Sequence, residues 1–233
     1  MDEEGENITM FDVVYAKMRE KIVLQRLIVI ARLRCDLTDR EELRAHYEKL
    51  NFRLKKQHVG DPITGLLLIY PSCLLQVIES SGVVLTSVLK DLAAMQQQPD
   101  DGLLETKIVF IAHNLQSRLF QKWSYKLLDE NQVAGHAVVK RLEEEEESTQ
   151  FLVCSVLSAL KKLGELLETT QEVLPGSVLD ETPELIVPEK ILEKLLGRDE
   201  LITPQQYLQM YQSPLKISIE FGQVNLRSFL SFR

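Results

Sequence analysis

The sequence is poor in the residues that build disulfide frameworks, metal sites and membrane spans. It has only three cysteines, Cys35, Cys73 and Cys154, which lie far apart and form no C-x-x-C pair. An odd, scattered set of this kind argues against disulfides and zinc, so we predict no metal site and a reducing compartment. No apolar stretch approaches the roughly 18 residues that cross a bilayer, and the N-terminus is acidic where a secretory signal is basic. We therefore predict a cytoplasmic protein.

Positive charge is also scarce. The chain has 27 Lys and Arg against 35 Asp and Glu, which gives a net charge of −8. Nucleic acids and anionic membranes select clustered cations, so we predict neither as a partner. The four histidines are scattered, and no G-x-S-x-G elbow or nearby Cys–His pair occurs. The sequence therefore predicts no catalytic residues and no enzymatic activity.

Two short apolar runs at the centre of the chain predict a buried β-hairpin. Leu66–Tyr70 and Leu74–Ile78 flank a Pro-Ser turn, and glycine or serine bounds each run on its outer side. One polar side chain, Gln76, interrupts the second run. Burying an amide without partners costs a few kcal/mol, so two interpretations stay open: a satisfied core amide, or an outward-facing edge position.

Apolar periodicity predicts further elements on both sides of this hairpin. Residues 38–56 have a helical stripe that follows a capping box, Thr38-x-x-Glu41, and residues 82–97 have a second helical stripe. Residues 24–33, 105–113 and 123–127 are apolar enough to be strands. The order strand, helix, strand, strand, helix, strand predicts an α+β fold with a ferredoxin-like sheet and two helices on one face.

The composition changes after this predicted domain. We divide the chain into an N-terminal segment (1–21) with a short helix at 10–22, a sheet domain (22–130), an acidic linker (131–147) and a helical extension (148–233). In the extension, residues 149–169 predict the strongest helix, and Pro188 and Thr203 begin shorter ones. Residues 215–221 alternate apolar and polar side chains, which predicts a short terminal strand.

Three sequence pieces resemble the signatures of BLUF domains, the blue-light sensors that use flavin. They are Ile63-Thr-Gly-Leu-Leu-Leu, Leu74-Leu-Gln-Val-Ile-Glu79, and Trp123-Ser-Tyr125 preceded by Phe120, and the resemblance covers roughly residues 22–130. It implies a BLUF-like version of the ferredoxin-like sheet. The BLUF glycine that follows the glutamate is replaced here by Ser80.

The resemblance also identifies four positions that would face a flavin. BLUF photochemistry needs a first-strand tyrosine and a third-strand glutamine, near an asparagine and a methionine. Matching without gaps places Val29, Gln76, His58 and Tyr125 at these positions, so only the glutamine is kept. Valine has no phenol and can donate neither an electron nor a proton to flavin. We therefore expect a degenerate pocket without cofactor; the alternative is a sensor-like protein that binds FAD.

These expectations combine into a functional hypothesis. A narrower resemblance, to a male germ-cell protein that joins such a domain to an acidic stretch and a helical extension, implies a cilium or flagellum location, the sperm axoneme. We expect a non-catalytic structural or scaffolding protein that docks on proteins of a larger complex. A homodimer is a further possibility, through the seam formed by Leu152, Val156, Leu160 and Leu163, although packing of this seam on the chain's own sheet is the favoured reading.

Overall fold

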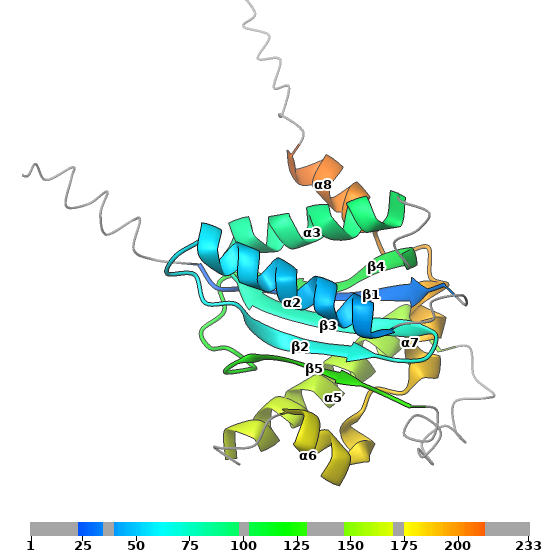
Figure 1. Ribbon diagram of the computed structural model, residues 1–233. Helices are drawn as coiled ribbons and strands as arrows, with labels where there is room; N and C mark the ends of the chain where they lie inside the picture. The colour runs from blue at the N-terminus through cyan, green and yellow to red at the C-terminus, as the bar shows by residue number, and fades with distance from the viewer. Residues whose placement is uncertain (1–22, 35–39, 98–102, 130–146, 170–174, 213–233) are drawn as a thin grey trace, which may run out of the picture.

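The structure, a computed structural model, describes residues 23–34, 40–97, 103–129, 147–169 and 175–212 (Figure 1). The strands are β1 (Gln25–Leu33), β2 (Thr64–Ile69), β3 (Cys73–Ser80), β4 (Leu103–Ala112) and β5 (Trp123–Leu127). The helices are α2 (Arg40–Gln57), α3 (Gly82–Gln97), α5 (Thr149–Thr169), α6 (Pro175–Glu181), the 3₁₀ helix η2 (Pro183–Leu185), α7 (Glu189–Leu196) and α8 (Pro204–Gln212).

One five-stranded sheet forms the centre of the molecule, in the order β4-β1-β3-β2-β5. The first four strands pair antiparallel, and β5 adds to β2 in parallel. The order 4-1-3-2, with α2 and α3 as the two crossovers, is the ferredoxin-like topology, which confirms the predicted α+β fold.

Helices α2 and α3 cover one face of this sheet, as predicted (Figure 1). Side chains along a strand alternate between faces, and here Leu27, Val29 and Ala31 of β1 pack in the core beneath these two helices. Ile28 and Ile30 belong to a second core on the opposite face. Because both faces are covered, the central strands can be apolar at nearly every position, which explains the continuous runs in the sequence.

The helical extension supplies the second layer (Figure 1). Helices α5, α6 and α7 pack on the face of the sheet opposite α2 and α3. Leu152, Val156, Leu160 and Leu163 of α5 are at most 2% exposed and lie in this core. The predicted seam therefore packs on the chain's own sheet, which was the favoured reading.

A segment beyond α7 wraps around the β4 edge. The Ile108 N–H of β4 donates a hydrogen bond to the Ile202 carbonyl (2.8 Å), and α8 then packs against α3. The predicted start of α8 is confirmed, because Thr203 and Gln206 cap it reciprocally, with bonds of 2.8 and 3.2 Å. This segment links the two helical layers.

Most predicted boundaries fall within two residues of the observed ones. Helix α6 was not predicted, because Pro175-Gly176 is a breaker pair in sequence, whereas proline is favoured in the first turn of a helix. The predicted helix at 10–22, the Thr38 cap, the terminal strand at 215–221 and nearly all of the acidic linker lie outside the described residues.

Candidate functional site

Three of the four positions identified by the resemblance lie in one row across the sheet. Val29 pairs with Gln76, Gln76 with Leu67, and Leu67 with Tyr125. Val29 and Leu67 belong to the core beneath α2 and α3, and directly opposed residues share a face, so the whole row faces these helices. The sheet therefore brings together the residues that a cofactor between the helices would meet.

Gln76 is a core residue rather than an outward-facing edge residue. It lies on β3, an interior strand, and is fully buried. Within the described part of the chain, neither its amide nitrogen nor its carbonyl oxygen has a hydrogen-bond partner. The expectation of an outward-facing edge position is thus wrong, and the row places the amide beneath α2 and α3 with no hydrogen-bond partner among the described protein groups.

The layer above this row is filled by side chains of α2 and α3. Tyr47 of α2 is fully buried, and Leu50 and Val88 belong to the same contiguous core cluster. At the outer side of the two helices, the His46 ring nitrogen lies 2.7 Å from an Asp91 carboxylate oxygen and ties α2 to α3. The interhelical space is therefore packed and bridged at its surface.

Two polar residues in this layer were not singled out by the sequence as site residues. Tyr47 belongs to the predicted core stripe of α2, and Asn51 lies one turn further along and is also buried. The Tyr47 hydroxyl and both amide atoms of Asn51 have no partner among the described residues. Burial raises the pKa of the Tyr47 phenol well above its usual value, and the Asp91 charge raises it further. The four-residue spacing of Tyr47 and Asn51 is the only sequence signal for this polar pair.

His58, the fourth position, lies away from the row. It follows the last turn of α2 and lines an open cleft of about 740 Å³. Residues 60–64 and 121–123 form the other walls, which include the half-buried Trp123. Tyr125 is half-buried beside the N-terminal half of α2, where the Arg44 guanidinium lies 5.0 Å from its ring centroid. Neither His58 nor Tyr125 fills the space between α2 and α3.

A buried carboxylate fixes the loop that leads into β5. Glu79, at the end of β3, is fully buried and receives Arg26 Nε and Nη2, each at 2.7 Å. Thr64 Oγ1 donates to it at 3.1 Å, and the backbone N–H groups of Leu119 and Phe120 donate at 2.8 to 3.1 Å. These donors, which come from three separate parts of the chain, hold the loop against the sheet.

A second guanidinium closes this network. Arg118 Nη1 donates to Thr64 Oγ1 at 2.9 Å and to the Glu79 carbonyl at 2.8 Å. Burial lowers the pKa of Arg118, while the charges of Glu79 and Asp61 oppose this effect. The loop before β5 is thus tied to β2 and β3 by Arg118 and Glu79, and Arg26 of β1 pairs with the carboxylate.

Sequence comparison places the chain in a family. The profile described as "Testis-expressed protein 47" matches residues 23–213, which include both helical layers and the sheet. The chain belongs to the testis-expressed protein 47 family. The match extends over the helical extension as well as the sheet domain, so the extension is part of what defines this family.

Solved structures with BLUF domains are also similar to this testis-expressed protein 47 family member. The structure titled "BlrP1 BLUF", a Klebsiella pneumoniae protein, is 21% identical with a TM-score of 0.35, over 47% of this chain and 66% of that one. A bacterial light-regulated adenylyl cyclase is 18% identical with a TM-score of 0.36, over 63% and 36%. The BLUF protein BlrB is 20% identical with a TM-score of 0.37, over 57% and 97%. The chain thus spans less than two thirds of the first two proteins.

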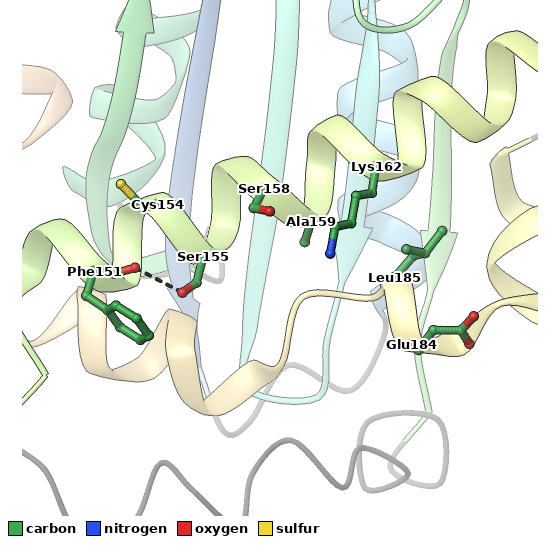
Figure 2. Close-up of a pocket in the computed structure, with 8 residues that line it drawn as sticks. All are labelled: Phe151, Cys154, Ser155, Ser158, Ala159, Lys162, Glu184 and Leu185. Atoms are coloured by element: carbon green, nitrogen blue, oxygen red, sulfur yellow. Dashed lines mark hydrogen bonds between the residues drawn. The ribbon is translucent and has the colours of Figure 1, made fainter.

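A second hollow of this family member, of about 410 Å³, lies on the outer surface of α5 beside η2 (Figure 2). Phe151 stands at one end and Leu185 at the other, while Lys162 extends alongside Ala159. The Ser155 hydroxyl donates to the Phe151 carbonyl at 2.9 Å and is therefore engaged by its own helix. Between these larger side chains, the small residues Cys154, Ser155, Ser158 and Ala159 line the hollow.

Metal binding, membrane insertion and thiol reactivity each depend on specific features of the described residues. Across the described ranges, no three His, Cys, Asp or Glu side chains are arranged to hold a metal ion. In the same ranges, no helix combines the length and apolarity that crossing a bilayer requires. Cys73 is buried and Cys154 is exposed, and neither is in a disulfide. Burial raises the pKa of the Cys73 thiol well above its usual value, which keeps it protonated and unreactive.

Proposed function

We propose that this chain is a non-catalytic scaffolding protein that uses a BLUF-like domain, without BLUF photochemistry, to dock in a larger assembly. One observation carries the proposal: Val29 is 1% exposed and pairs with Gln76 in the row beneath the helices. The resemblance requires a tyrosine at this position, and valine supplies neither a transferable proton nor an electron. A flavin in this site would have no redox partner at the position where the photocycle needs one.

The packing between the helices gives independent support. A planar flavin ring would have to displace Tyr47 and its apolar neighbours, which are buried in a continuous core. Protein cores are close-packed, so a ring of this size enters only if the two helices separate. Separation would also break the contact between His46 and Asp91. This packing therefore supports a domain without flavin between α2 and α3.

We infer that the assembly is in the sperm flagellum and that the protein is cytoplasmic and axonemal. The support is the testis-expressed protein 47 family membership, together with the retention of a fold whose cofactor positions have changed. The test is to extract sperm with non-ionic detergent and locate the protein with a specific antibody. We expect it to remain with the demembranated axoneme and to be released by high salt. Complete release by detergent alone would refute an axonemal scaffold.

A second candidate function, flavin binding, is favoured by one observation. Gln76, Tyr47 and Asn51 leave five buried polar atoms without partners in the described part of the chain. Such atoms are costly unless water or a ligand pairs with them. The deciding measurement is the visible absorption spectrum of the protein purified from cells supplied with riboflavin. We expect a colourless protein, and stoichiometric flavin would overturn the absence of a cofactor.

A further inference from the structure

The second half of α2 departs from the acidic character of the chain. From residue 49 to residue 58 it has four lysines or arginines, one histidine and no acidic residue, in a protein whose net charge is −8. Within this stretch, Arg53 pairs with Asp91 of α3 at 3.6 Å. Among the described residues, no acidic group lies within ion-pair distance of Lys49 or Lys55. This concentration of cations is therefore not explained by pairing within the fold.

These cations adjoin the 740 Å³ cleft. Lys55 and His58 form one rim, and Lys122, before β5, stands on the other. Trp123 and the buried Ile63 supply apolar wall between the two rims. The cleft thus combines positive rims with an apolar wall.

The same charge continues outside the cleft along α2. Lys49 and Lys56 lie on the outward side of α2, seven residues or about 10 Å apart at 1.5 Å per residue, and Lys55 lies about 100° round the helix from Lys56, toward β5. Among the described residues that line the cleft, the acidic one is Asp61, which already accepts a hydrogen bond from Ser81 at 2.6 Å. The basic groove, defined as Lys49, Lys55, Lys56, His58 and Lys122, therefore extends from the cleft over the outward side of α2; Arg53 is directed to Asp91 of α3 and is not part of it.

We propose that the basic groove is the docking surface for an acidic, extended polypeptide segment of a partner protein, with one apolar side chain of the segment beside Trp123. An extended chain advances about 3.3 Å per residue, so three or four acidic residues match the cations along α2. Complementary charge steers such a segment and fixes its direction, while the cleft wall buries its apolar side chain. The inference names the partner class for the proposed scaffold and rests on that function.

Two other polyanions fit the groove less well. Phe52 is 60% exposed, and the Lys56 ammonium lies 4.4 Å from its ring centroid, so insertion of this ring into a bilayer would give up a cation–π contact. A membrane also presents a flat surface, whereas the apolar part of the groove is a cleft. A nucleic acid extends beyond the groove, and the net charge of −8 repels its remaining phosphates.

The test uses the full chain and a fluorescein-labelled peptide of glutamates around one phenylalanine, with binding followed by fluorescence anisotropy. The test variant is Lys55→Glu, Lys56→Glu, Lys122→Glu. Its matched control is Lys161→Glu, Lys162→Glu, Lys190→Glu, which changes exposed lysines of α5 and α7. Each triple variant moves the net charge from −8 to −14, so non-specific repulsion is equal in both.

We expect the wild-type chain to bind the peptide with an affinity that falls as salt rises. Each exposed pair is worth roughly a two- to fivefold change in affinity, so the three replacements together should weaken binding by about eightfold or more. The control should stay within about threefold of the wild-type chain. Equal losses in both variants would show an effect of net charge alone and overturn the groove.

Vesicles rich in phosphatidylserine and a polyuridine RNA complete the test. Binding of either one through the same three lysines, without binding of the peptide, would overturn the proposed partner class. The outcome is separable from the proposed function, because a protein that stays on the axoneme while failing to bind the peptide remains a scaffold. Conversely, a detergent-extracted protein that binds the peptide would refute the axonemal scaffold and leave the groove intact.

Discussion

Replacement of Glu79 by glutamine tests how the loop before β5 is held to the sheet. The carboxylate is fully buried and pairs with Arg26, whose side chain keeps 18% exposure. Removing one partner of a buried pair costs about 3 to 5 kcal/mol, because the remaining charge loses its compensation. Water can reach part of Arg26, and the glutamine oxygen can still accept one backbone N–H bond. We therefore expect Glu79→Gln to lower the free energy of unfolding by about 3 kcal/mol, at the bottom of that range.

The assay is urea unfolding followed by tryptophan fluorescence. The chain has a single tryptophan, Trp123, which begins β5 directly after the loop that Glu79 holds. For a protein of this size, a loss of about 3 kcal/mol corresponds to roughly 6 to 12 °C in Tm. The matched control is Glu105→Gln, because Glu105 is 36% exposed and lies 3.7 Å from Arg32. An exposed pair of this kind contributes at most about 1 kcal/mol.

The reasoning would fail if Glu79→Gln were no more destabilising than Glu105→Gln. A double variant distinguishes loss of the ion pair from a purely steric effect of the amide. In the double variant Arg26→Met, Glu79→Leu, both charges are removed, and apolar pairs of similar volume are often tolerated in place of a buried ion pair. We expect this double variant to be more stable than either single replacement of Arg26 or Glu79 by the same residue. Additive losses would show that the two side chains are not coupled.

Further predictions concern the turn glycines and the buried polar groups. Gly65→Ala should lower the free energy of unfolding in urea by about 3 kcal/mol or more, because φ is +145° and a Cβ would lie 2.0 Å from a β3 carbonyl oxygen. Gly60→Ala, with open space around the position, should lower it by about 1 to 2 kcal/mol. Tyr70→Phe should cost about 1 to 2 kcal/mol through loss of its 2.8 Å hydrogen bond, whereas Tyr47→Phe should be neutral, because that hydroxyl has no described partner. The phenols of Tyr47 and Tyr70 both have a raised pKa in the folded chain. The free energy of unfolding should therefore fall as pH rises above about 10, where the same phenols ionise in the unfolded chain. Tyr47→Phe should reduce this fall when unfolding is measured as a function of pH. Gln76→Leu should leave the Tm unchanged or raise it, and a lowered Tm would reveal a water or ligand bound to the amide.

The sheet domain could be predicted because its local signals agree with its global topology. The runs at 66–70 and 74–78 are too short for helices, and the stripe at 82–97 coincides with α3. Residue matching also placed Val29 and Gln76 at corresponding points of two strands, and the observed register pairs them directly. Local propensity, apolar period and turn chemistry all favoured one arrangement, which is the condition for a predictable fold.

The filling of the interhelical space could not be predicted in the same way. The sequence places Tyr47 on an apolar stripe, but nothing local indicates that it lies between two helices rather than above a strand. The contact between His46 and Asp91 joins residues 45 positions apart, and such pairs depend on the packing of whole elements. Helix α6 was missed for a related reason, since a Pro-Gly pair favours both a break and a new helix start.

The covering of both sheet faces restricts how this protein can dock. In the described chain, α2 and α3 cover one face, α5 to α7 cover the other, and the segment before α8 covers part of the β4 edge. A partner therefore meets mainly the outer surfaces of helices, the loops and the β5 edge, rather than an open sheet.

Two of these loops, at residues 58–64 and 121–123, lead directly into strands of the sheet: β2 begins at residue 64, and β5 at residue 123. Because the Glu79 network fixes the loop that leads to Trp123, it also fixes one wall of the basic groove. Glu79→Gln should consequently weaken binding of the acidic peptide, although Glu79 does not line the groove. If Glu79→Gln lowered stability but left the affinity for the peptide unchanged, the Glu79 network would not be what fixes the docking surface.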